Sequence, residues 1–94
     1  MKAKAPTHRF NLGQILLAPQ AEQRLESVEV TTALRRHACG DWGEAPPHQV
    51  SENERSLRDG GSVLSVFRDG RQCRFCVLTN SYRSATLVVN CADE

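Results

Sequence analysis

The stretch SVLSVFRDGRQCRFCVL (residues 62–78) decides the fold, because it reads as two β-strands around one tight turn. Runs of aliphatic and aromatic residues on both sides of Asp69-Gly70 are typical of a two-residue hairpin. That turn places Val66 opposite Cys73, and paired residues share a face of the sheet. We therefore expect one apolar face, made by Leu64, Val66, Cys73, Phe75 and Val77.

A third β-rich run, ATLVVNC (85–91), follows the turn NSYR and completes a meander. An odd number of loop residues would add Ala85, Leu87 and Val89 to the apolar face, and an even number would turn them away from it. We favour the odd number, because it completes one apolar side.

The clearest helix precedes these strands, and its apolar stripe ends before Gly40, a residue suited to the left-handed helix cap. Arg35 and Arg36 fall off the stripe, so they should face solvent. The stripe consists of Val30, Ala33, Leu34, His37 and Ala38.

Shorter helices are predicted over 19–26, where Pro19 suits the first turn, and over 52–59, where SENE reads as a capping box with Ser51 as the cap. APPHQV (45–50) reads as an extended connector, and the run ILL in NLGQILLAP is a candidate short strand.

These patterns predict one α+β domain over 10–94, preceded by a flexible tail over 1–9. Short N-terminal helices pack on a C-terminal three-stranded antiparallel meander, and a short extra N-terminal strand is left open. Twelve Lys and Arg against 11 Asp and Glu give a net charge of +1, which argues against strong non-specific attraction to a polyanion. No run has the length of a membrane span or the apolar core of a signal peptide, so we expect a cytoplasmic location with reduced cysteines.

Four cysteines raise the question of a metal site. Cys73 and Cys76 have the two-residue gap of a zinc pair, but within a strand residues three apart point to opposite faces. Cys39 and Cys91 each stand alone, so we expect no metal and no cofactor. A five-residue loop would place Cys73 opposite Cys91, and a disulfide there would form only under oxidising conditions.

The run RRHACGDWGE (35–44) brings two arginines, a histidine, a cysteine, two acids and a tryptophan together around two glycines. His37 reads either as a core-edge histidine or as part of an acid–base cluster with Asp41, Glu44 and Arg83. His37 and Cys39 are two apart on a helix, so they do not face each other as a catalytic pair would.

Trp42 either folds back onto the helix that it follows or stands out as a binding anchor. Tryptophan and arginine are enriched at interaction hot spots. The candidate contact patch is therefore Arg35, Arg36, His37, Asp41, Trp42, Glu44 and Arg83. A nucleic-acid surface is the alternative, with Phe67 and Arg74 on one sheet face and Arg71 at the turn; its residues are Phe67, Arg68, Arg71 and Arg74.

Around ALRRHACGDWGE, SENERSLRDGGSVLSVFR and LTNSYRSATLVV, the chain resembles a family of small proteins, described as plasmid-related, that are encoded in bacterial genomes and on plasmids and other mobile elements. The resemblance also includes NLGQILLAP and covers about four-fifths of the chain. Relatives commonly carry an aromatic residue in place of Cys76 and a polar one in place of Cys73, which argues against a required zinc site. The matching residues are His37, Gly40, Asp41, Trp42, Gly43, Asn53, Leu57, Thr79, Arg83 and Ser84. The resemblance implies no catalytic residue.

We therefore expect a small binding protein without enzymatic activity that acts on a protein partner, such as a host or defence complex met by a mobile element. The alternatives are a nucleic-acid binder and a small hydrolase, and a homodimer is left open.

Overall fold

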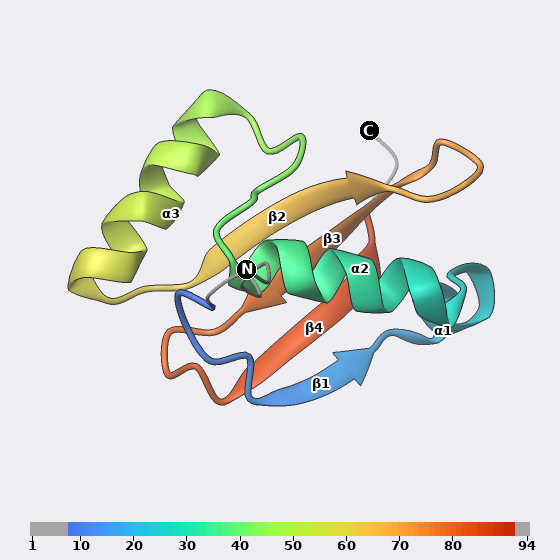
Figure 1. Ribbon diagram of the computed structural model, residues 1–94, viewed down its shortest axis with the longest axis horizontal. Helices are drawn as coiled ribbons and strands as arrows, with labels where there is room; N and C mark the ends of the chain where they lie inside the picture. Colours follow the sequence, from blue (N-terminus) through green and yellow to red (C-terminus); the bar gives the residue numbers. More distant parts are fainter. Residues whose placement is uncertain (1–7, 92–94) are drawn as a thin grey trace, which may run out of the picture.

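The computed structural model describes residues 8–91, and they form an α+β fold of three helices and one four-stranded sheet (Figure 1). The predicted α+β class is confirmed. Residues 1–7 of the expected tail lie outside the described part of the chain. The elements in order are β1 (Gln14–Leu17), α1 (Pro19–Arg24), α2 (Ser27–Ala38), α3 (Pro47–Asp59), β2 (Val63–Arg68), β3 (Arg74–Thr79) and β4 (Ala85–Asn90).

The sheet has the order β1-β4-β3-β2. Its last three strands form the expected antiparallel meander, but β1 adds a fourth strand that runs parallel to β4. The three-stranded, wholly antiparallel sheet is therefore wrong in strand number and in pairing. The short N-terminal strand that the sequence left open is β1.

The register of the β2–β3 hairpin differs from the expected one. Val66 lies opposite Cys76 rather than Cys73, because residues 69–73 all belong to the loop. Asp69 stabilises this longer loop through its Oδ1, which accepts hydrogen bonds from the backbone N–H of Arg71 (2.8 Å) and of Cys73 (2.9 Å). An Asp side chain that holds its own turn in this way replaces the tight two-residue turn.

The β3–β4 connection also reverses an expectation. Its last pair is Thr79 with Thr86, so residues 80–85, an even number, lie between the paired residues. Leu87 is therefore opposite Leu78, and Val88 is opposite Val77. Ala85, Leu87 and Val89 lie on the face away from Phe75 and Val77, and the odd loop that we favoured is wrong.

The helix bounds depart from prediction mainly in α3. Pro47 occupies its first turn and the N–H of Val50 bonds to the carbonyl of Pro46 (3.0 Å), so APPHQV starts the helix instead of connecting elements. Ser51 lies inside α3 and is not a cap. The capping box belongs to α2, where Glu26 and Glu29 satisfy each other's backbone N–H groups.

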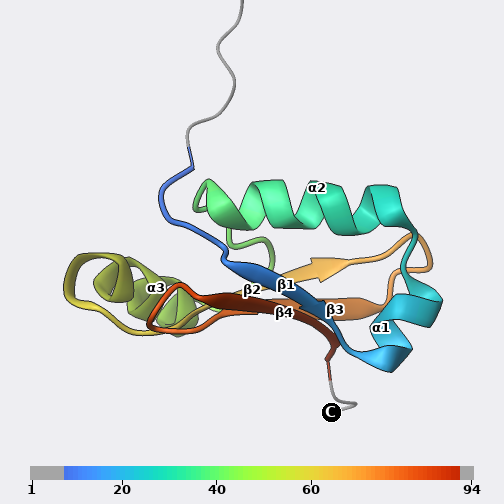
Figure 2. The same ribbon diagram turned by 90° about the horizontal axis from the view of Figure 1, so that it is seen from below.

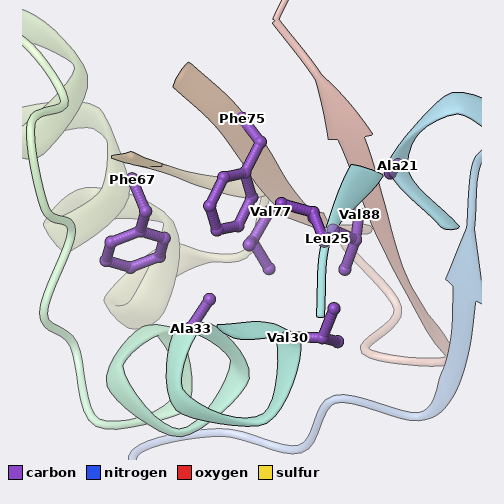
Figure 3. Packing of buried hydrophobic residues seen from close by; sticks show 8 residues of the cluster. All are labelled: Ala21, Leu25, Val30, Ala33, Phe67, Phe75, Val77 and Val88. Atoms are coloured by element: carbon purple, nitrogen blue, oxygen red, sulfur yellow. The ribbon is translucent and has the colours of Figure 1, made fainter. Parts of the chain in front are cut away.

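The core lies between α2 and one face of the sheet (Figure 3). Phe75, Val77 and Val88 point from the strands toward Val30 and Ala33 of α2, and all five are at most 9% exposed. The apolar stripe of α2 thus packs where its periodicity predicted. The cluster is completed by Ala21, Leu25 and Phe67.

The helices cover the sheet unevenly. In Figure 2, α2 runs across one face, while α1 and α3 lie at opposite ends of the sheet. Within residues 8–91 no helix crosses the other face, and none is long and apolar enough to span a membrane. This second face carries aliphatic side chains. The fold therefore has two layers, α2 and the sheet, and the sheet face away from α2 is apolar without a covering helix.

Candidate functional site

The GDWG segment lies beside the edge strand β2. The N–H of Val66 donates to the carbonyl of Trp42 (3.2 Å), and the N–H of Glu44 donates to the carbonyl of Val66 (2.7 Å). Gly43 thereby forms a parallel bridge with Val66. The segment therefore satisfies backbone groups that an edge strand would otherwise leave open.

A buried polar chain lies under the C-terminal half of α2. Nδ1 of His37 is 2.5 Å from Oγ of Ser65, and Nε2 is 2.9 Å from Oγ1 of Thr79. Oγ1 of Thr79 is 2.7 Å from Oγ1 of Thr86, which donates to the carbonyl of Leu12 (2.7 Å). The four side chains are fully buried. The chain ties α2 to β2, β3, β4 and the segment before β1.

The direction of these bonds fixes the tautomer of His37. The hydroxyl of Thr86 donates its only proton to the carbonyl of Leu12, so it must accept the hydrogen bond from the hydroxyl of Thr79. Thr79 must then accept from His37, which places the ring proton on Nε2 and leaves Nδ1 to accept from Ser65. Burial, assisted by the positive charge of Arg83, lowers the pKa of His37 to about 4. His37 is therefore a neutral core residue at physiological pH.

Trp42 folds back into the molecule and is 5% exposed. Its ring stacks on Phe10, with centroids 6.2 Å apart, and meets His37 edge-on at 5.8 Å. Its Nε1–H donates to Oε2 of Glu54 (3.0 Å), which together with Oε1 also receives both terminal nitrogens of Arg9. These contacts give Trp42 and the described end of the expected tail a structural role.

Arg83 is an internal clamp. Its guanidinium donates to the carbonyls of Gly61 (2.7 Å), Asn80 (2.8 Å) and Ser56 (3.3 Å), and it lies over the ring of Phe10 at 5.3 Å. Arg83 therefore holds the end of α3 against the β3–β4 turn. It does not join Asp41 or Glu44 in one cluster, because those two residues pair elsewhere.

The exposed acids of the candidate patch are both in ion pairs. Nε of Arg36 is 2.7 Å from Oδ2 of Asp41, and Nε of Arg68 is 2.8 Å from Oε2 of Glu44. Arg36 also lies over the ring of Phe67 at 4.6 Å. The hydrogen bond from Arg36 holds the pKa of Asp41 below its ordinary value. Of the predicted patch, Arg35, Arg36, Asp41 and Glu44 are at the surface, and His37 and Trp42 are not.

The predicted nucleic-acid platform does not form as one face. Phe67 points into the core and is 4% exposed, whereas Arg74 lies opposite Arg68 on the other side of the sheet. The register change explains this separation. Arg71 lies in the hairpin loop.

The cysteines and histidines of the described residues do not come together as a metal site. Cys76 is half-buried on the sheet face away from α2, and Cys73 is exposed in the hairpin loop. Among residues 8–91, no three His, Cys, Asp or Glu side chains gather as metal ligands. Cys91 lines the same hollow as Cys73.

Sequence reasoning missed two features. The hydroxyl chain from Ser65 through Thr79 to Thr86 was signalled only by polar residues recurring within apolar strands. Arg24 also lies beside the hairpin loop, where its Nη2 donates to Sγ of Cys73 (3.4 Å), and no pattern in α1 predicts that contact.

Comparisons of the chain with protein-family models, with curated proteins and with solved structures give no match.

Proposed function

We propose that this is a binding protein without enzymatic activity, and that it engages a protein partner through the sheet face away from α2. We call this surface the open face. The single observation that carries the proposal is that an apolar face of the central sheet has no covering helix (Figure 2). The apolar members of the open face are Leu16, Leu64, Val66, Cys76, Leu78, Ala85, Leu87 and Val89.

Exposure of the open face supports a contact role. Leu16 is 43% exposed and Leu78 is 36% exposed, Val66 is buried, and the other members are half-buried. Contiguous exposed apolar patches are rare on monomeric proteins and often mark interaction sites. A sheet that is apolar on both sides is normally covered on both sides.

The charges bordering the open face indicate the chemistry of the partner. Arg68 and Arg74 are paired across β2 and β3 at one end of this face. The strand positions between that end and Leu16 are uncharged. A matching partner presents an apolar surface, such as one side of an amphipathic helix, with an acidic group at one end. The family resemblance extends the proposal to a host or defence complex as that partner.

The burial of the histidine supports a function without catalysis. Among residues 8–91, Ser65 and His37 form the one arrangement that resembles a nucleophile and its base, and both are 0% exposed. The second ring nitrogen faces a threonine rather than a carboxylate. A substrate would need access to Ser65, which the packed core does not give.

The test compares Leu78→Asp with Val28→Asp in the full chain. Both positions are exposed, but Val28 is 64% exposed on α2, on the other side of the sheet. Proteins from the native host are captured and cross-linked on each variant, and hydrogen exchange then maps the protected strands. We expect Leu78→Asp to lose the partner and Val28→Asp to retain it, with protection in β3 and β4.

Three results would contradict the proposal. Equal loss of the partner in both variants would remove the open face as the contact surface. Protection confined to α2 would do the same. A wild-type dimer that Leu78→Asp dissociates would assign the open face to a second copy of the chain instead.

A further inference from the structure

Three arginines from three elements surround one hollow at the hairpin end of the sheet. Arg24 comes from the last turn of α1, Arg68 from the end of β2 and Arg74 from the start of β3. The hollow has a volume of about 220 Å³. Its remaining lining residues are Gln72, Cys73, Asn90 and Cys91.

The lining of this hollow is rich in arginine. Among the described residues that line it, none is acidic. Glu44 binds Arg68 through Nε, and the carbonyl of Gln72 binds its Nη1 (2.9 Å), so the guanidinium is held in place. The carboxylate of Asp69 is engaged by backbone N–H groups of its own loop.

We propose that this hollow, which we call the arginine hollow, binds one phosphate group of a small phosphate ester. Arginine presents a planar fork of donors that matches phosphate oxygens, and the negative charge of a phosphate suits several cations better than a single carboxylate does. Three arginines from separate elements line the hollow, so a tetrahedral group there is within reach of more than one element. The amides of Gln72 and Asn90 are further donors.

The size of the hollow limits the ligand. Pockets that enclose whole small molecules have volumes of about 300–1,000 Å³, so the arginine hollow holds a charged group while the rest of the ligand stays outside. The neighbouring hollow beyond Arg24 contains Glu26, Glu29 and Asp69. These acids disfavour a long polyanion that continues along the hairpin, so the phosphate belongs to a small molecule rather than to a nucleic acid.

The test is an NMR titration of the full chain with inorganic phosphate, with a nucleoside monophosphate and with a single-stranded oligonucleotide. We expect the amides of Cys73, Asn90 and Cys91 to shift with phosphate and with the monophosphate. Arg24→Gln should weaken both affinities about tenfold, the value of one charge-assisted contact. Arg24 is exposed and its guanidinium donates to the sulfur of Cys73 in a surface loop, so this variant should fold.

Arg35→Gln is the matched control, because Arg35 is an exposed arginine on α2 that does not line the arginine hollow. It should bind phosphate like the wild type. Absence of shifts at the three amides, or equal weakening in both variants, would overturn the proposal. Binding of the oligonucleotide alone would overturn the assignment to a small ester. None of these changes alters the open face, so the two proposals can fail separately.

Discussion

The side-chain amide of Asn53 forms two hydrogen bonds with the backbone of Leu64. The N–H of Leu64 donates to Oδ1 (3.0 Å), and Nδ2 donates to the carbonyl oxygen of Leu64 (2.8 Å). A single buried side chain on α3 thus pairs with the edge of β2 as another strand would. With the Trp42–Glu44 segment beside Val66, it blocks further pairing along this edge.

Asn53→Ala should destabilise the protein by about 2–4 kcal/mol, because it leaves two backbone groups of Leu64 without partners. Urea unfolding followed by circular dichroism measures this loss. Glu52→Gln, one residue away on the exposed side of α3, should change the free energy of unfolding by less than about 0.5 kcal/mol. Equal values for the two variants would show that Asn53 does not hold the edge.

The helices and strands of this chain were largely readable from local pattern. The stripe from Val30 to Ala38 placed α2 against the core, and the β-rich runs placed β2, β3 and β4. Register was not readable, because it depends on the loops. Asp69 bonds its own loop, and Glu29 of α2 bonds the N–H of Gly70 (2.6 Å). The second contact is tertiary, and no hairpin rule contains it.

The candidate site was predictable only for residues whose position depends on their own helix or strand and not on contacts between elements. The placement of Arg35 and Arg36 at the surface follows from the helix period, and the structure agrees. The open face and the arginine hollow both depend on the register of β2 and β3. Shifting this register by an odd number of residues moves every side chain of one strand to the opposite face of the sheet. A correct hairpin register would have separated Phe67 from Arg74 at the outset.

The buried histidine makes stability depend on pH. The pKa of His37 is about 4 in the folded protein and 6.5 when exposed, so below pH 6.5 the unfolded chain binds the extra proton first. The free energy of unfolding should therefore be highest above pH 6.5 and fall between pH 6.5 and 4, by about 3 kcal/mol in total. Urea unfolding at several pH values measures it.

His37→Gln should be less stable at pH 7 and should lack most of this pH dependence between pH 6.5 and 5, above the range where carboxylates titrate. His48→Gln, at an exposed position in α3, should keep the wild-type profile. A His37 variant that retains the full slope would show that another group causes it.

Glu54 makes two contacts, a hydrogen bond from the indole N–H of Trp42 and an ion pair with Arg9, and two substitutions separate them. Glu54→Gln keeps an oxygen for Trp42 and loses only the charge that faces Arg9. Because the two side chains of that ion pair are 42% and 38% exposed, the loss should be below about 1 kcal/mol. Glu54→Leu leaves the buried indole N–H without its partner and should cost about 1–3 kcal/mol.

The unfolding of the Glu54→Gln and Glu54→Leu variants can be followed by the fluorescence of Trp42, the single tryptophan of the chain. The folded protein should emit at a shorter wavelength than the unfolded chain, because the ring is buried. If the glutamine and leucine variants were equally unstable, the ion pair with Arg9 rather than the bond to Trp42 would be the stabilising contact.

The close approach of the GDWG segment to β2 depends on Gly43. Its φ is +64°, and a Cβ there would lie 2.1 Å from the carbonyl oxygen of Val66 and 2.7 Å from Cδ1 of Phe67. Gly43→Ala should therefore destabilise the protein by about 3 kcal/mol or more, since backbone strain and a steric clash add. Gly60→Ala separates the two effects, because Gly60 has a φ of +96° but no atom within 4 Å of its Cβ position. It should cost only the backbone strain, about 1–3 kcal/mol. Chemical denaturation of both variants gives the difference, and a Gly43 variant no less stable than the Gly60 variant would mean that the segment can move away from β2 at no cost.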